Sequence, residues 1–210
     1  MRDSLERLTN RPFSAVGPYT SLFRIAGIHD FAGAARHVRA LPYGRIADRQ
    51  KLWLVLEEAR GSCTTKHALL AELAREQGID VHLTLGMYEM NERNTPGVGR
   101  VLSAYRLEYI PEAHCYLRYE DGRIDVTGLP AAAEPIDHFL HEEPITVDQI
   151  GAYKHDVHQR YLHSWIAHTD FVRGRSLEEI WCIREACIAA LAVADSPALS
   201  SSLRRPRHRS

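Results

Sequence analysis

The 210-residue sequence lacks the features that mark several classes of protein. It has only four cysteines and no C-x-x-C pair, and this pattern argues against a zinc site with thiolate ligands. No apolar run approaches the length of a membrane span, and the segment Met1–Pro12 has no apolar stretch of the kind found in signal peptides. These absences predict a protein of the reducing cytoplasm, with free thiols and no membrane partner.

Neither sign of charge is in large excess. The chain carries 26 basic and 27 acidic side chains, for a net charge of −1. The C-terminal segment Leu203–Ser210 holds four arginines and no acid, so the remaining body has 22 basic and 27 acidic side chains, a net −5. An acidic body does not provide a broad nucleic-acid interface, and we expect no nucleic-acid partner.

The composition is that of a globular domain, with 45% hydrophobic and 25% charged residues. A chain of this length buries roughly 70% of its unfolded surface and needs neither a disulfide nor a metal to hold its core. We expect a single domain at 1–195, with its core at about 48–130 and a helical appendage at about 145–195. The basic segment 196–210 is predicted to be disordered.

Helix patterns flank a series of strand patterns, and this order predicts an α+β fold. The chain up to about Thr20 is predicted to be irregular. The predicted helices are Phe31–Leu41 capped by Asp30, Asp48–Glu58, Cys63–Gln77 ended by Gly78, a segment from Thr146 or Asp148 to about Ala167, and one opened by the capping box of Ser176 and Glu179. The predicted strands are Val81–Tyr88, Val101–Ile110, Ala113–Tyr119 and Arg123–Thr127, with a polar loop at Asn91–Gly99.

Cys63 stands where a helix is predicted to begin, directly after Gly61-Ser62. A nucleophilic cysteine needs surroundings that lower the pKa of its thiol. The unpaired amides and the dipole of a helix N-terminus favour a thiolate, and the same amides can hold a tetrahedral oxyanion. Gly61 is expected to let a substrate backbone approach closely. Cys63 is therefore a predicted nucleophile; the alternative is a small buried packing residue.

A base for Cys63 and a group that orients this base are found further along the chain. His114 begins a predicted strand, and Asp125 lies on the next strand. A two-residue loop at Asp121-Gly122 would place Asp125 opposite Arg118 and roughly 13 Å from His114, beyond hydrogen-bonding reach. A four-residue loop, Tyr119–Gly122 with a left-handed Gly122, places Asp125 opposite Tyr116 and within side-chain reach of His114.

Three blocks of the chain occur in an order that a known family shares. The first is Gly61-Ser62-Cys63-Thr64-Thr65-Lys66-His67-Ala68-Leu69-Leu70, continuing through Gln77-Gly78-Ile79 into a strand; the second is His114-Cys115-Tyr116; the third is Ile124-Asp125-Val126-Thr127. Over about Leu52–Thr127 the chain resembles the transglutaminase-like superfamily, of the bacterial type. The resemblance implies a papain/transglutaminase-like core, in which a Cys-bearing helix packs on an antiparallel sheet, with extra N- and C-terminal helices.

This resemblance also implies a role for each of three residues: Cys63 is the nucleophile, His114 the base and Asp125 the group that orients the base. The family includes peptidases, amidases, protein crosslinkers and members that have lost activity. Where the family often has an aromatic soon after its cysteine, this chain has Thr64–Lys66, and Tyr116 stands where a tryptophan is frequent. These departures leave the substrate open.

Papain-like enzymes often supply an additional oxyanion donor from the segment before the cysteine. Tyr43, Gln50 and Trp53 lie in that segment, and Thr64 follows the cysteine directly. We take Tyr43, Gln50 and Thr64 as oxyanion or cleft candidates, whereas Trp53 is expected in the core. His67, one turn beyond Cys63, is expected at the surface or behind the site.

The remaining cysteines and a histidine-rich helix have simpler interpretations. Cys115, Cys182 and Cys187 are predicted to be packing residues. His155 and His158 share a helical face, with His163 further along, and could hold a transition metal, although no HExxH pattern supports this. A solvated helix face is the expected alternative, and no metal is assigned.

The sequence thus predicts a cysteine-dependent amide hydrolase or acyl transferase that works through a thioacyl intermediate and needs no cofactor. Its expected partner is a peptide, protein or small amide substrate. The alternative is a non-catalytic module of the same fold that binds a peptide or a partner protein, and a third reading is a metal-binding protein that uses the histidine-rich helix.

Overall fold

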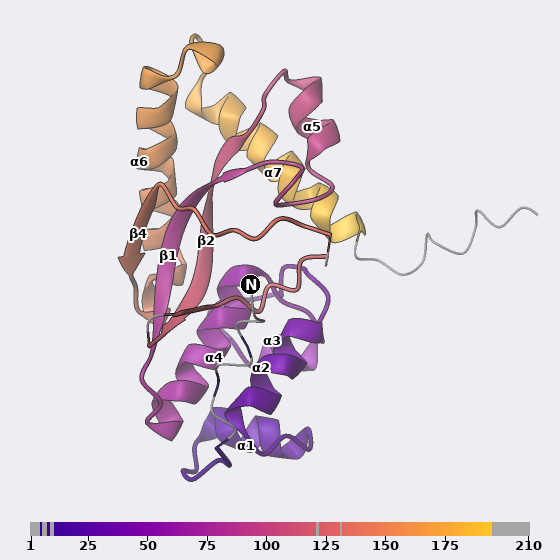
Figure 1. The fold of residues 1–210 in the computed structure, drawn as a ribbon, viewed down its shortest axis with the longest axis vertical. Coiled ribbons are helices and arrows are strands. Elements are labelled where there is room, and N and C mark those ends of the chain that lie inside the picture. Colours follow the sequence, from indigo (N-terminus) through magenta and orange to yellow (C-terminus); the bar gives the residue numbers. More distant parts are fainter. Residues whose placement is uncertain (1–4, 6–7, 9–10, 121, 131, 195–210) are drawn as a thin grey trace, which may run out of the picture.

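The computed structural model describes residues 5, 8, 11–120, 122–130 and 132–194, and the fold is α+β (Figure 1). Within this part of the chain, four strands form one antiparallel sheet in the order β3-β2-β1-β4. The strands are β1 (Val81–Met90), β2 (Ile110–Tyr119), β3 (Gly122–Ile124) and β4 (His141–Pro144). The predicted disordered segment 196–210 lies outside the described residues.

The helices form two groups around the long strands β1 and β2, and α6 runs alongside the sheet (Figure 1). The lower group in Figure 1 is α1 (Pro18–Ile25), α2 (Phe31–Ala40), α3 (Leu54–Glu57) and α4 (Cys63–Gln77). The upper group is α5 (Gly99–Ala104), α6 (Ala152–His168) and α7 (Leu177–Ala194), and the short 3-10 helices η2 (Val147–Ile150) and η3 (Asp170–Val172) flank α6 along the chain.

Two hydrophobic clusters hold the molecule together, and β1 and β2 contribute to both. The first cluster packs α1, α2 and α4 against one face of the sheet, where Leu85 and Cys115 are fully buried. The second packs α5, α6 and α7 against Met90 and Ile110 near the other ends of the same strands. The first turn of α4 lies where the two clusters meet, since Ile46 of the first cluster and Ile188 of the second line one pocket with Cys63.

Local capping patterns predicted several elements well. Asp30 caps α2 by accepting a hydrogen bond from the Gly33 amide at 2.6 Å. Helix α4 has the predicted bounds, and Gly78 ends it in the left-handed conformation with φ of 61°. At α7 the Ser176 hydroxyl accepts from the Glu179 amide at 3.1 Å.

Other predictions were wrong. The segment Val101–Ile110 is not a strand, because its first part belongs to α5, whose Leu102 packs in the second cluster. Asp48–Glu58 is not a long helix: only α3 is helical, and the Asp48 carboxylate accepts from the Gln50 amide at 3.0 Å in a local turn. Helix α1 begins at Pro18, inside the stretch predicted to be irregular, and β4 was not predicted.

Candidate active site

Cys63 is the first residue of α4, and the sequence before it shapes this helix start. The Ser62 side chain accepts from the Thr65 amide while the Thr65 hydroxyl accepts from the Ser62 amide, which forms a capping box. This arrangement fixes the start of the helix, and the positive end of the helix dipole lies at Cys63. Gly61 is required by the close approach of Lys66, whose Cγ would lie 2.8 Å from a Cβ at this position.

The hairpin of β2 and β3 brings Asp125 to His114. Leu117 pairs with Ile124, which is the register expected for an Asp125 opposite Tyr116. Tyr119 pairs directly with Gly122, and Glu120 adopts the left-handed conformation with φ of 51°, whereas the sequence predicted it for Gly122. The Asp125 carboxylate lies 2.7 Å from His114 Nε2, and its second oxygen accepts from the Thr127 amide at 2.8 Å.

His114 and Cys63 interact electrostatically, and both have strongly shifted pKa values. Burial raises the pKa of Cys63, but the charges of Lys154 and His114, together with hydrogen bonds from the His114 ring and the Cys115 amide, lower this pKa from 9.0 to about 6. Burial lowers the pKa of His114, yet Asp125 and the Cys63 thiolate raise it well above 6.5. The favoured state at neutral pH is therefore a thiolate next to an imidazolium.

Asp125 remains ionised in this arrangement. Burial raises the pKa of its carboxyl. The positive charge of His114 and the hydrogen bond from its ring outweigh this effect and lower the pKa far below 3.8. Because His114 Nε2 is hydrogen-bonded to Asp125, Nδ1 is the ring nitrogen that can interact with the Cys63 sulfur. The carboxylate thus orients the ring and stabilises its protonated form.

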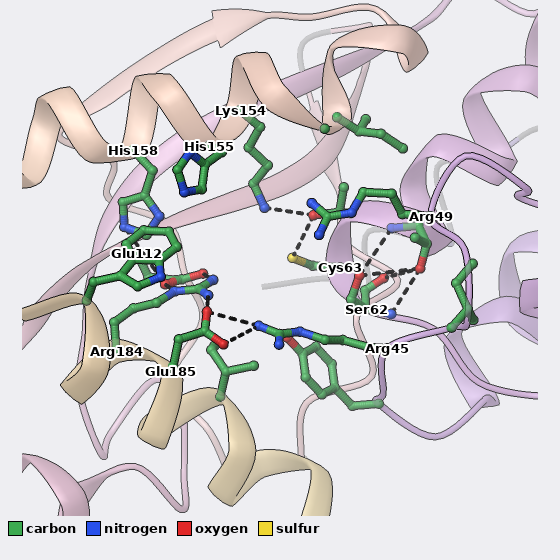
Figure 2. A pocket seen from close by; sticks show the side chains of 18 of the residues that line it. Arg45, Arg49, Ser62, Cys63, Glu112, Lys154, His155, His158, Arg184 and Glu185 are labelled. Carbon is green, nitrogen blue, oxygen red and sulfur yellow. Dashed lines mark hydrogen bonds and ion pairs between the residues drawn. The ribbon is translucent and has the colours of Figure 1, made fainter. Parts of the chain in front are cut away.

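Lys154 of α6 supplies a second cation to the site. Its ammonium group donates to the Thr64 hydroxyl at 2.7 Å, and this hydroxyl lies 3.8 Å from the Cys63 sulfur (Figure 2). Lys154 is also the first of the charges that lower the pKa of Cys63. Nothing in the local sequence identified Lys154, because it comes from a helix far along the chain that reaches Cys63 only through tertiary packing.

His67 lies completely buried behind the triad, and its neighbours determine its tautomer. The Val126 amide donates to His67 Nε2 at 2.8 Å, so this nitrogen carries no proton. His67 Nδ1 then donates to the Cys63 carbonyl at 2.6 Å. Burial leads the causes that lower the pKa of His67 from 6.5 to about 4, so the ring is neutral at neutral pH. A neutral His67 connects the nucleophile's backbone to the strand end next to Asp125.

A pocket of about 230 Å³ opens beside the Cys63 sulfur (Figure 2). Two ion pairs form part of its wall. Arg184 of α7 binds the buried Glu112 carboxylate with both ends of its guanidinium, at 2.6 Å for the Nε contact. Arg45 binds Glu185 at 2.8 Å. The remaining lining residues with charged or titratable side chains are Arg49, Lys154, His155 and His158.

Cys63 and His114 also line a second, narrow slot. Its lining includes Tyr88, whose hydroxyl hydrogen-bonds with the Thr95 hydroxyl at 3.0 Å. Thr95 belongs to the polar loop Asn91–Gly99, so part of this loop lies beside the site. Phe139 stacks on the His114 ring, with centroids 6.4 Å apart and planes 17° apart, and covers the imidazole.

The structure separates the remaining candidates. Tyr43 and Thr64 line the pocket next to Cys63, and burial leads the causes that raise the pKa of Tyr43, so its hydroxyl stays protonated. Gln50 is exposed and lines a different groove, between the end of α4 and β4. Trp53 is 42% exposed and was wrongly expected in the core.

Two other sequence expectations can be compared with the structure. Within the described residues, no group of three His, Cys, Asp or Glu side chains is arranged to hold a metal ion. His158 is buried, within hydrogen-bonding distance of the Pro111 carbonyl at 2.9 Å, whereas His155 is exposed. All four cysteines are free; Cys115 and Cys187 are buried as predicted, but Cys182 is exposed.

No helix in the described part of the chain combines the length and the apolar composition that a membrane span requires. Comparisons of the chain with protein-family models, with curated proteins and with solved structures find no match. The assignment of a function therefore depends on the geometry and the electrostatics of the site.

Proposed function

We propose that the protein is a cysteine-dependent amide hydrolase or acyl transferase with a papain/transglutaminase-like core. The observation that carries this proposal is a Cys63 thiol at the first residue of α4 that shares a pocket lining with His114, whose ring is held by Asp125 at 2.7 Å; this environment lowers the pKa of the thiol. A packing cysteine has no need of this environment, since burial by itself raises the pKa of a thiol. The triad occurs in the order Cys-His-Asp, which is also the order of the family that the sequence resembles.

The reaction proceeds through a thioester. The Cys63 thiolate attacks the amide carbonyl, and the oxyanion is held by the first-turn amides of α4. The C–N bond breaks as the His114 imidazolium gives its proton to the leaving amine. Water or a second amine then attacks the thioester, His114 takes up the proton of this nucleophile, and the C–S bond breaks to restore the thiolate. The substrate is an amide of a peptide, a protein or a small molecule.

The first test is the pH dependence of thiol alkylation. Iodoacetamide should label Cys63 with an apparent pKa of about 6, as followed by mass spectrometry of the Cys63 peptide. The exposed Cys182 in the same sample is the internal reference. A Cys182→Ser variant should leave labelling of Cys63 unchanged. If Cys63 reacts only above pH 8, like an ordinary thiol, the proposal is wrong.

The second test separates an enzyme from a binding module, because an acidic thiol does not by itself establish turnover. With p-nitrophenyl acetate, the wild type should release a burst of one nitrophenolate per chain and carry an acetyl group on Cys63. Slow continued release shows that the thioester is hydrolysed. A labelled Cys63 that never acylates would instead support the non-catalytic module that binds a peptide or a partner.

A further inference from the structure

The charges around the pocket beside Cys63 do not balance. Its two acidic side chains, Glu112 and Glu185, are engaged by Arg184 and Arg45. Within the described residues, Lys154 has no carboxylate within 4 Å, and its one hydrogen bond goes to a neutral hydroxyl. The charges cancel within each ion pair, so Lys154 faces the Cys63 thiolate and has no carboxylate partner among the described residues.

Arg49 adds a second excess cation at the pocket mouth. Its side chain is exposed, lines the pocket and has no acidic partner among the described residues. Figure 2 shows Lys154 and Arg49 extending toward the pocket above the Cys63 sulfur, Lys154 from α6 and Arg49 from the segment before α3. A concave wall with two cations that have no carboxylate partner attracts anions.

We propose that the acyl part of the substrate carries a carboxylate, which Lys154 and Arg49 bind while the amide carbonyl lies at Cys63. This inference rests on the proposed function and specifies its substrate class. Lys154 reaches the sulfur's immediate surroundings through the Thr64 hydroxyl, so the carboxylate lies only a few bonds from the scissile carbonyl. Lys154 would thus serve both the thiolate and the substrate.

Two alkylating reagents provide the test, because iodoacetate carries a carboxylate and iodoacetamide does not. Both react by forming an S–C bond to the thiolate and releasing iodide. The ratio of their rates at one cysteine cancels the thiolate fraction, so it reports only how the site treats the reagent's charge. We would measure this ratio for Cys63 at pH 6 and divide it by the same ratio for the exposed Cys182.

The normalised ratio at Cys63 should exceed one by about fivefold or more in low salt, and about 0.5 M NaCl should reduce it. Lys154→Gln should lower it by about threefold, and Arg49→Gln should lower it by a smaller factor. The control Arg160→Gln removes an exposed cation of the same helix that does not line the pocket, and should leave the ratio unchanged.

The remaining outcomes distinguish a failure of the anionic-substrate proposal from a failure of the proposed function. A normalised ratio of one or less, with Cys63 still labelled by iodoacetamide at pH 6, overturns the anionic substrate and leaves the proposed function in place. A ratio that Lys154→Gln and Arg160→Gln lower equally also overturns it, because the effect would then be general charge. A Cys63 that neither reagent labels at pH 6 contradicts the proposed function itself.

Discussion

The protonation state of His67 gives the sharpest prediction about how pH controls this fold. The native ring is neutral because burial lowers its pKa to about 4, and the Val126 amide donates to its unprotonated Nε2; the pKa takes its ordinary value of 6.5 in the unfolded chain. Between these two values the unfolded state binds a proton that the native state does not. His67 therefore makes the native state progressively less stable as pH falls from about 6.5 to about 4, by about 3 kcal/mol in all.

Two substitutions isolate this contribution. Gln in place of His67 keeps an oxygen near the Nε2 position that can accept from Val126, but removes the side-chain donor to the Cys63 carbonyl, which keeps only the backbone hydrogen bond of its helix. Asn keeps a donor near the Nδ1 position and leaves the Val126 amide without an acceptor. At pH 7 the Asn variant should be less stable than the wild type by about 1–3 kcal/mol, the usual cost of one unpaired buried group. The Gln variant should lose only about 0.5–1.5 kcal/mol, the net value of one hydrogen bond, because the Cys63 carbonyl keeps its backbone donor.

The measurement is urea unfolding, followed by tryptophan fluorescence at several pH values between 7.5 and 4.5. Neither variant titrates at this position, so the wild type's advantage should shrink by about 2–3 kcal/mol over this range. Titration of the other groups is common to all three proteins and cancels in the difference. A wild-type advantage that is constant or grows toward acid pH would refute the neutral tautomer and the pKa on which this reasoning depends.

Three further substitutions test the site and its wall. Cys63→Ser should abolish labelling and the acetyl burst while changing the free energy of unfolding by about 1 kcal/mol or less, since little apolar contact is lost; a large drop in stability would favour a packing role. Asp125→Asn removes the charge that sustains the imidazolium of His114, so alkylation of Cys63 at pH 6 should slow by about tenfold or more, and an unchanged rate would remove Asp125 from the triad. Arg184→Met leaves the Glu112 carboxylate buried without its partner and should destabilise the fold by about 3–5 kcal/mol in thermal melts, with recovery when Glu112→Met is added; failure of this recovery would contradict the ion-pair account.

The sequence predicted best what depends on nearby residues. Asp30 caps a helix through an amide three residues away, and Gly78 ends α4 because glycine tolerates the left-handed conformation there. The bounds of α4, and with them the place of Cys63, follow from such local preferences. Asp125 could be tied to His114 because a hairpin has few possible registers, and one of them puts both side chains within reach.

The errors arose where packing between distant segments decides the structure. The residues of Val101–Ile110 favour strands, but burying Leu102 against α7 stabilises a helix instead. Cys182 lies outside the buried stripe of α7, which is formed by Ile180, Ile183 and Cys187, and this orientation depends on where the helix docks. Lys154 could not be assigned for the same reason.

The distance along the chain between the thiol and its lysine has a consequence during synthesis. Thr64, beside the nucleophile, and Lys154 are separated by 90 positions. A ribosome that adds about 5–20 residues per second needs roughly 5–20 s to make this stretch. Until α6 has emerged and docked, Cys63 lacks one of the charges that make it a thiolate, and a less ionised thiol reacts more slowly with oxidants and electrophiles. The nascent chain thus acquires its full reactivity only when its C-terminal half is in place.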